Sequence, residues 1–179
     1  KSKEKGVSIL VEYALKTING QYKDLLNICR TESEYIKMTI EKSGSLVALA
    51  SLLGTVLATD KYPSFVKSYS EYIGLIGQID NDIADIREWN SKNDLINHKY
   101  SLPIIFLLNC QDEEVQLIRD YYNKKVSKSE LLKNQDIVNR KFKESGAIIY
   151  AEAIKRLYKN RAMKQIQSIS FNKLLKYIY

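Results

Sequence analysis

The chain has 179 residues, of which 45% are hydrophobic and 27% charged, so it is long enough to bury a core and too apolar for a disordered protein. Its net charge of +7 is compatible with nucleic acid, acidic membranes or phosphorylated small molecules as partners. Only 7 glycines and 2 prolines occur, which favours long helices with few tight turns.

The first half of the chain predicts two helices. Apolar residues at helical spacing predict one helix over Val7–Asn19. The Gly-Gln pair at 20–21 marks either an interruption of that helix or a close approach of another backbone. Thr31 and Glu34 have the spacing of a capping box, which predicts a long helix from about Glu32 to Ala58.

The second half predicts further helices and no strands. Pro63 is expected to open a helix over about Ser64–Glu88, and the polar segment Asn90–His98 is expected to be a loop. Helices are then predicted near residues 102–108, 113–123, 128–135, 138–159 and 162–179. We therefore expect an all-α fold with a single domain over residues 1–179.

The cysteines and the apolar segments bear on where the protein resides. Cys29 and Cys110 offer no metal-ligand spacing and no disulfide framework, so we expect reduced, buried cysteines in a cytoplasmic protein. The longest apolar stretch, Leu46–Ala58, is shorter than the roughly 20 residues that a membrane span needs. A buried core helix, and a protein that is not transmembrane, is the expectation.

An acidic helix face is the most informative local pattern. Gln78, Asn81, Asp82 and Asp85 fall at i, i+3, i+4 and i+7, and so share one face of the predicted helix. Two acids one turn apart repel each other, whereas Mg²⁺ takes carboxylate oxygens and shares them with phosphate oxygens. The alternative is an ordinary surface helix whose acids pair with local lysines.

Two more motifs contain lysines. They are Tyr35-x-x-Met38-x-x-x-Lys42-Ser43-Gly44-x-Leu46 and Asp94-Leu95-x-x-x-Lys99-Tyr100-Ser101-Leu102-Pro103. A lysine at the mouth of an apolar segment, such as Lys42, binds phosphate as a point charge or extends its ammonium group to solvent. Lys99 lies in a loop before a Pro-started helix, where it is either a phosphate ligand or an ordinary loop charge.

The order and spacing of these three motifs resemble the C-terminal half of the trans-isoprenyl diphosphate synthases, or polyprenyl synthetases, over about Leu10–Leu108. The Gly-Gln pair at 20–21 with Asp24 resembles a family pair as well. Three segments also resemble the ComQ-type subgroup, which prenylates a tryptophan of a pheromone peptide. They are Ser43–Ala50, Val56–Thr59 and Tyr69-Ser70-x-Tyr72.

The resemblance implies antiparallel helices around a deep apolar cavity, the isoprenoid synthase type of bundle. It implies Mg²⁺ at the acidic motif, with Asn81, Asp82 and Asp85 as its matching positions, and an allylic diphosphate gripped by that ion. Lys42, Gln78 and Lys99 match the residues that contact diphosphate, and Lys42, Ser43 and Gln78 are the expected catalytic group. Cations and metal ions neutralise the charge that grows on a leaving diphosphate.

The chain departs from the family pattern in three ways. The family's first Asp-rich motif and its neighbouring arginine pair are absent from these 179 residues. Asn81 stands where the second motif usually begins with an aspartate, and Gly77 stands where an aromatic residue usually precedes the glutamine. We therefore expect the C-terminal part of a domain that is completed by N-terminal helices or by another chain. The family usually forms homodimers through its long central helices, and we expect the Glu32–Ala58 helix to serve in this chain.

Three functions follow for testing. The first is a Mg²⁺-dependent prenyltransferase that uses geranyl or farnesyl diphosphate and transfers to isopentenyl diphosphate or to a peptide tryptophan. The second is a catalytically silent homologue or subunit, favoured by Asn81. The third is a nucleic-acid-binding bundle. Its basic patch shows no interleaved aromatic residues, so no nucleic acid is expected as a partner. The patch comprises Lys155, Arg156, Lys159, Arg161 and Lys164.

Overall fold

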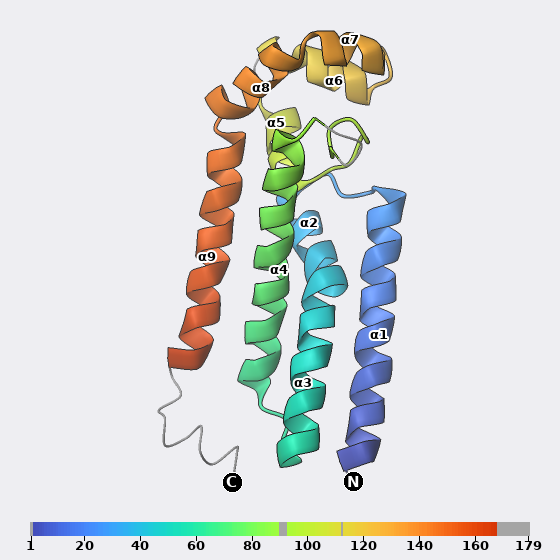
Figure 1. Cartoon of the computed structure of the whole chain (residues 1–179), viewed down its shortest axis with the longest axis vertical. Coiled ribbons are helices and arrows are strands. Elements are labelled where there is room, and N and C mark those ends of the chain that lie inside the picture. The colour runs from blue at the N-terminus through green and yellow to red at the C-terminus, as the bar shows by residue number, and fades with distance from the viewer. Residues whose placement is uncertain (1, 90–92, 112, 168–179) are drawn as a thin grey trace. The chain divides into compact units, whose positions relative to one another are not determined.

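The computed structural model describes residues 2–89, 93–111 and 113–167. Every regular element in these residues is a helix, which confirms the all-α prediction (Figure 1). The elements are α1 (Ser2–Leu26), α2 (Glu32–Thr39), η1 (Ile40–Gly44), α3 (Ser45–Thr59), α4 (Ser64–Arg87), α5 (Leu102–Asn109), η2 (Glu113–Val115), α6 (Gln116–Tyr122), α7 (Lys128–Lys133), α8 (Gln135–Glu144) and α9 (Ala147–Gln167).

The chain divides into two compact units. Unit 1 comprises Lys1–Leu26, Ile36–Gln78 and Lys155–Tyr179, and unit 2 comprises Asn27–Tyr35 and Ile79–Ile154. Each unit has its own apolar core and is described by itself. The expectation of one domain over residues 1–179 stays a prediction.

Unit 1 is built on two long helices that run side by side, α1 and α3 (Figure 1). Their shared core contains Ile9, Tyr13, Ala48, Leu52 and Val56, all buried. The first helix is confirmed but is longer at both ends than the predicted Val7–Asn19. It begins at Ser2 and runs without a break through Gly20 to Leu26. The predicted interruption at the Gly-Gln pair is therefore wrong. The alternative, a close approach of another backbone, is confirmed, because a Cβ on Gly20 would overlap the backbone of Lys42.

The predicted long helix from Glu32 to Ala58 is confirmed as one continuous helical stretch that ends at Thr59. The capping box is confirmed too, because Glu34 N donates to Thr31 Oγ1 and Thr31 N donates to Glu34 Oε2. The sequence pattern did not predict the middle of this stretch, where η1 is a π-helix with one wide turn.

The same helical stretch is long and apolar enough, by length and composition alone, to cross a membrane. The expectation that the segment is too short is therefore wrong, because the continuous helix extends well beyond Leu46–Ala58. The test is weak, since a core helix of a soluble protein passes it as well. Among the described residues it is the one helix that meets the test.

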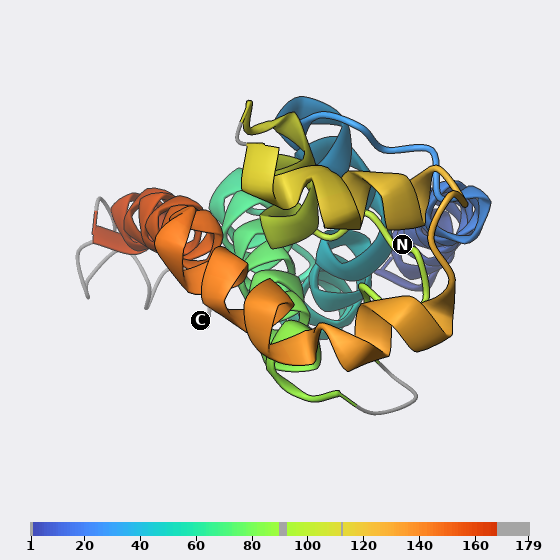
Figure 2. The ribbon, with the colours of Figure 1, turned by 90° about the horizontal axis from the view of Figure 1, so that it is seen from above.

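Unit 2 packs several short helices on a second core, and Figure 2 shows α6, α7 and α8 from above. This core includes Ile86, Leu95, Ile104, Leu107, Val115, Ile118, Tyr121, Leu131, Val138, Phe142 and Ala147. The prediction of one helix over 138–159 is wrong. Gly146 takes a φ of 77° between α8 and α9, a conformation that glycine adopts without strain and that ends the first helix.

The remaining predictions fare unevenly. Helices near Ser64–Glu88 and 102–108 are confirmed as α4 and α5, and those near 113–123 and 128–135 as the shorter η2, α6 and α7. The predicted break before Ala162 is absent, because α9 continues to Gln167. The loop residues 90–92 and the end of the predicted last helix, 168–179, lie outside the described residues. Neither cysteine forms a disulfide bond; Cys29 is buried and Cys110 is half-buried.

Candidate functional site

Unit 1 places Lys42 and Ser43 inside the π-helical turn η1. A π-turn carries one residue more than an α-turn and often occurs at functional sites. The ammonium group of Lys42 is half-buried and forms an ion pair with Asp24 at 2.6 Å between Nζ and Oδ2. A second cross-helix ion pair joins Lys23 to Glu41. Two ion pairs therefore fix α1 against the turn that holds Lys42.

Glycines let two helices approach this turn closely. A Cβ on Gly20 of α1 would overlap the backbone of Glu41 and Lys42, and one on Gly74 of α4 would lie 2.6 Å from Gly44 Cα. Real Cβ atoms do not approach other atoms this closely, so each position requires glycine. The backbone of Lys42, Ser43 and Gly44 is thus enclosed by α1 and α4.

The hydroxyl of Ser43 donates a hydrogen bond to the side-chain carbonyl of Gln78, with 3.0 Å between Oγ and Oε1. Lys42, Ser43 and Gln78 therefore lie together in unit 1, as the sequence motifs predicted. Two polar oxygens are thereby held next to the turn that carries Lys42.

The acidic face of α4 is not uniform. Asp82 is only 3% exposed and accepts a hydrogen bond from the hydroxyl of Tyr35 at 2.6 Å. The backbone N of Leu102, at the start of α5, lies 3.5 Å from the same oxygen. Asn81 is exposed and Asp85 is half-buried. One acid of the motif therefore lies in the interior of unit 2, while two motif residues remain accessible.

No group of three or more His, Cys, Asp or Glu side chains in the described part of the chain is arranged to hold a metal ion. The structure thus offers no closed cage of protein ligands among those residues. Mg²⁺ does not need one, since it commonly binds one or two carboxylates and completes its shell with water and phosphate oxygens. Asp85 and the amide oxygen of Asn81 fit that kind of shared site.

Lys99 lies in a loop that unit 2 holds firmly. Asn93 begins the loop, donating from its amide to the carbonyls of Ile86 and Glu88 at the end of α4 and accepting from Ile96 N. Asp94 is buried and forms an ion pair with Lys99 at 3.4 Å between Oδ1 and Nζ. The ammonium group of Lys99 is itself largely exposed. The loop therefore presents a surface cation anchored to a buried acid.

Three side chains from elsewhere in unit 2 grip the backbone of this loop. Asn27 donates to His98 O at 2.6 Å and accepts from Tyr100 N at 3.1 Å. The hydroxyl of Tyr122 donates to Lys99 O at 2.6 Å, and that of Tyr121 donates to Ile96 O at 2.7 Å. Every one of these bonds is made to backbone, so they fix the path of the loop rather than any particular side chain.

Burial sets the ionisation of this region. Desolvation raises the pKa of Asp94, the Lys99 ammonium opposes the rise, and the negative charge of Asp85 adds to it. Burial also raises the pKa of the Tyr122 hydroxyl well above its usual value, and the charge of Asp94 contributes. Burial therefore disfavours the charged form of Asp94, and the nearby Lys99 ammonium group offsets part of that cost.

Sequence patterns predicted the residues of the motifs but not their supports. Lys42, Ser43 and Gln78 lie in unit 1, and Asn81, Asp82, Asp85 and Lys99 lie in unit 2. The supports that sequence reasoning missed are Asn27, Asn93, Tyr121 and Tyr122. Asn27 carried one usable signal, since asparagine after a helix often takes positive φ, and here φ is 54°.

Comparisons with known proteins agree with this arrangement. A family profile described as "Polyprenyl synthetase" matches residues 1–140. The tryptophan prenyltransferase ComQ of Bacillus subtilis subsp. natto is 35% identical over 151 residues, which are 84% of this chain and 46% of that protein. The geranylgeranyl pyrophosphate synthase of Dictyostelium discoideum is 25% identical over 181 residues, 96% of this chain and 58% of that protein.

A solved structure shows the same fold. The geranylgeranyl pyrophosphate synthase from Bacteroides thetaiotaomicron aligns with a TM-score of 0.72 and 22% identity, over 96% of this chain and 61% of that chain. The fold is therefore that of the isoprenyl synthases. The chain spans about half the length of the curated relatives it matches.

Proposed function

Because the chain belongs to the polyprenyl synthetase family, we propose that it acts in prenyl transfer from an allylic isoprenoid diphosphate of the geranyl or farnesyl class, with release of pyrophosphate. The observation that carries the proposal is the hydrogen-bonded pair of Ser43 and Gln78 next to Lys42 in the π-turn. These are the residues in unit 1 at which the family motifs place diphosphate binding and catalysis.

The charges of the π-turn suit a polyanionic substrate. Lys42 is held by one carboxylate, Asp24, and a diphosphate oxygen supplies a stronger acceptor for the same ammonium group. Positive charge near the bridging oxygen favours departure of the diphosphate, because it stabilises the charge that develops there. The oxygens of Ser43 and Gln78 carry partial negative charge, which stabilises an allylic cation left behind.

In unit 2 we propose that Asn81 and Asp85 share Mg²⁺ with the substrate's phosphate oxygens and that Lys99 contacts diphosphate. When bound, the ion supplies positive charge to the leaving group. Asp82 belongs to the same motif but is buried, and the Tyr35 hydroxyl holds its orientation. We propose that its negative charge attracts the ion without binding it directly. Side-chain bonds to its backbone fix the path of the Lys99 loop, so little ordering of the loop backbone is left for substrate to induce.

For the acceptor we favour a tryptophan side chain in a peptide, because a tryptophan prenyltransferase is 35% identical to this chain whereas a geranylgeranyl pyrophosphate synthase is 25% identical. Isopentenyl diphosphate is the second candidate. A catalytically silent homologue is the third, favoured by the asparagine at position 81. We further propose a cytoplasmic protein, since neither cysteine forms a disulfide bond.

The experiment is a transfer assay on the 179-residue chain with labelled farnesyl diphosphate and Mg²⁺, offered a tryptophan-containing peptide or isopentenyl diphosphate in separate reactions. We expect label in the peptide and release of pyrophosphate. Lys42→Ala and Gln78→Ala should each lower the rate by about 10²-fold. Lys37→Ala, an exposed lysine on α2, is the matched control and should leave the rate unchanged. No pyrophosphate release with either acceptor, from this chain alone and from the chain mixed with the N-terminal half of a related prenyltransferase, would favour the silent homologue.

A further inference from the structure

Unit 2 contains a cavity that plays no part in the proposed reaction. It has a volume of about 540 Å³ and lies where the end of α4, the body of α8 and the start of α9 meet. That volume is in the range of pockets that bind small ligands or single large side chains. Its lining residues are Ile86, Arg87, Asn139, Phe142, Lys143, Ile148 and Ile149.

The walls of this cavity are apolar, and its charges are all positive. Ile86 and Phe142 belong to the buried core beneath it. Arg87 and Lys143 contribute a guanidinium and an ammonium group, and neither forms an ion pair within the described ranges. Their neighbours on α8 differ, since Arg140 and Lys141 both pair with Glu144. The cavity therefore combines an apolar floor with two cations that no carboxylate in the described part neutralises.

Asn139 adds neutral donors to the same wall. Its side-chain oxygen accepts a hydrogen bond from the indole nitrogen of Trp89 at 2.8 Å. Since an indole N–H only donates, this bond fixes the oxygen of the amide on the Trp89 side. The oxygen of Asn139 is thereby occupied, and the donors that its side chain still offers to a ligand are its amide N–H groups.

The rim of the cavity is apolar as well. Ile149 lines it and is 71% exposed. An apolar centre and rim with separate donors from α4 and α8 fits a ligand that carries several dispersed acceptors around one apolar group. A peptide with carboxylates next to an apolar side chain has that chemistry, whereas a lipid phosphate concentrates its charge in one head group.

We propose that this cavity binds an acidic peptide segment, which inserts one apolar side chain between α4, α8 and α9 and places carboxylates against Arg87 and Lys143. The proposal rests on the proposed function only in the expectation that the segment belongs to the peptide that carries the acceptor tryptophan. Binding itself requires neither Mg²⁺ nor an allylic diphosphate, so it is measured separately from catalysis.

Trp89 is the chain's single tryptophan and bonds to a cavity residue, which makes it a site-specific reporter. Labelling with 5-fluorotryptophan gives one fluorine signal, which is followed while the blocked peptide Asp-Glu-Phe-Asp-Glu is added. We expect a saturable change in chemical shift. The peptides Asp-Glu-Ala-Asp-Glu and Asn-Gln-Phe-Asn-Gln should each bind about tenfold more weakly, because one lacks the apolar side chain and the other lacks the charge.

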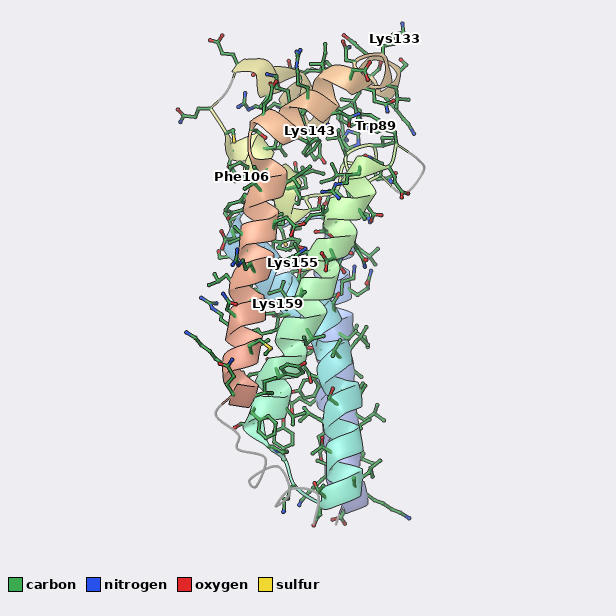
Figure 3. The ribbon with its side chains drawn as sticks, turned by 60° about the vertical axis from the view of Figure 1, so that its left-hand side comes forward. Trp89, Phe106, Lys133, Lys143, Lys155 and Lys159 are labelled. Atoms are coloured by element: carbon green, nitrogen blue, oxygen red, sulfur yellow. The ribbon has the colours of Figure 1, made fainter. Side chains whose placement is uncertain are left out.

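The variant Arg87→Gln/Lys143→Gln tests the two cations. We expect its dissociation constant for the acidic peptide to rise about tenfold. Lys133→Gln on α7 is the matched control and should change it by less than about twofold, because Lys133 lies at the far end of the α7–α8 pair from Lys143 (Figure 3). Both sets of residues are exposed, so circular dichroism should show unchanged helix content.

Three results would overturn the proposal: no shift at millimolar peptide, equal binding of the acidic and amide peptides, or tighter binding of octyl phosphate than of the acidic peptide. The last would assign the cavity to a lipid-like anion. If the chain does not bind the peptide but transfers the prenyl group, the cavity proposal is wrong and the proposed function stands. If it binds the peptide but transfers no prenyl group, the proposed function is wrong and the cavity proposal stands.

Discussion

Asp82 and Asp94 are both almost fully buried in unit 2, yet the groups that stabilise the two carboxylates differ. Asp82 receives a short hydrogen bond from Tyr35, which offsets the cost of removing a carboxylate from water. Asp94 has the more distant ammonium group of Lys99, and desolvation dominates its pKa. The two acids of the motif region are therefore stabilised by different partners.

Removing the hydroxyl of Tyr35 tests the first of these environments. Tyr35→Phe leaves the buried Asp82 carboxylate without its charge-assisted hydrogen bond, so we expect the free energy of unfolding to fall by about 1.5–3 kcal/mol. Urea unfolding followed by circular dichroism measures it. Tyr69→Phe removes a half-buried hydroxyl for which the structure gives no hydrogen bond in the described part, and should cost less than about 0.5 kcal/mol. Equal losses in the two variants would show that the Asp82 bond contributes nothing.

The pKa of Asp94 predicts a pH dependence of stability. Because burial raises this pKa above its ordinary value of 3.8, the native state binds the proton more tightly than the unfolded chain does. The contribution to stability is therefore fully present below 3.8 and is lost as pH rises through the native pKa, by at most about 1.4 kcal/mol per pH unit. Asp94→Asn should remove this component.

The measurement is urea unfolding of the parent chain and of Asp94→Asn between pH 4 and pH 8. The difference in stability should grow in favour of the variant as the pH rises, because only the parent keeps a charged, buried carboxylate. A difference that is constant over this range would contradict the raised pKa. Asp136→Asn on the exposed face of α8 is the control and should run parallel to the parent.

At the scale of helices, a feature was predicted correctly when the residues that cause it lie within one turn of it. The Thr31–Glu34 cap and Pro63 act within one turn, and the starts of those helices were predicted correctly. The break at Gly146 was missed, because the apolar spacing continues through it and only a positive φ reveals the change of direction. The π-turn was missed for the opposite reason, since it arises from the packing of α1 and α4 rather than from its own residues.

The candidate site follows the same division. Lys42, Gln78 and Lys99 lie in motifs that a linear pattern displays, and the resemblance of those motifs to a family implied each as a site residue. Asn27 bonds to His98, which lies 71 residues further along the chain, and Tyr122 bonds to Lys99, 23 residues before it. No local pattern connects either side chain to the Lys99 loop. Long-range supports of this kind become visible only when the chain is folded.

Two glycines on long helices give a matched pair of tests. Gly20→Ala places a methyl group against the backbone of Lys42, so α1 has to move away from the π-turn. We expect a loss of about 2–4 kcal/mol of stability and a lower affinity for pyrophosphate. Gly54→Ala, within α3, meets nothing within 4 Å and should raise stability by about 0.5–1 kcal/mol, because alanine favours helix. Thermal unfolding and calorimetry with pyrophosphate measure both effects.

At the scale of the whole chain, α1 bears an apolar stripe that unit 1 does not cover. Val7, Val11, Leu15, Ile18, Tyr22 and Leu25 are each more than half exposed and recur at intervals of three or four residues. That spacing is typical of a seam between two packed helices. The sequence pointed instead to the Glu32–Ala58 helix for dimerisation. We propose that the stripe on α1 pairs with the same stripe of a second copy, the alternative being helices of a longer chain.

The prediction is that the chain associates through this stripe. Leu15→Glu/Ile18→Glu places two charges in the seam and should raise the dimer dissociation constant more than about tenfold. Light scattering coupled to size-exclusion chromatography measures the mass. Leu57→Glu changes an equally exposed leucine on α3 and should leave the mass unchanged. A parent chain that is monomeric at every concentration would leave the longer-chain alternative.

The wide turn at Ile40–Gly44 also governs how the long helical stretch tolerates changes in length. A π-turn holds one residue more than an α-turn, so deleting one residue there would restore regular winding and leave the helix after it in nearly the same rotation relative to the helix before it. The apolar side chains of α3, such as Leu52 and Val56, would then still face Ile9 and Tyr13, whereas a deletion within α3 itself would rotate the residues after it by about 100°. A one-codon deletion in this turn should therefore damage the core of unit 1 less than a one-codon deletion within α3.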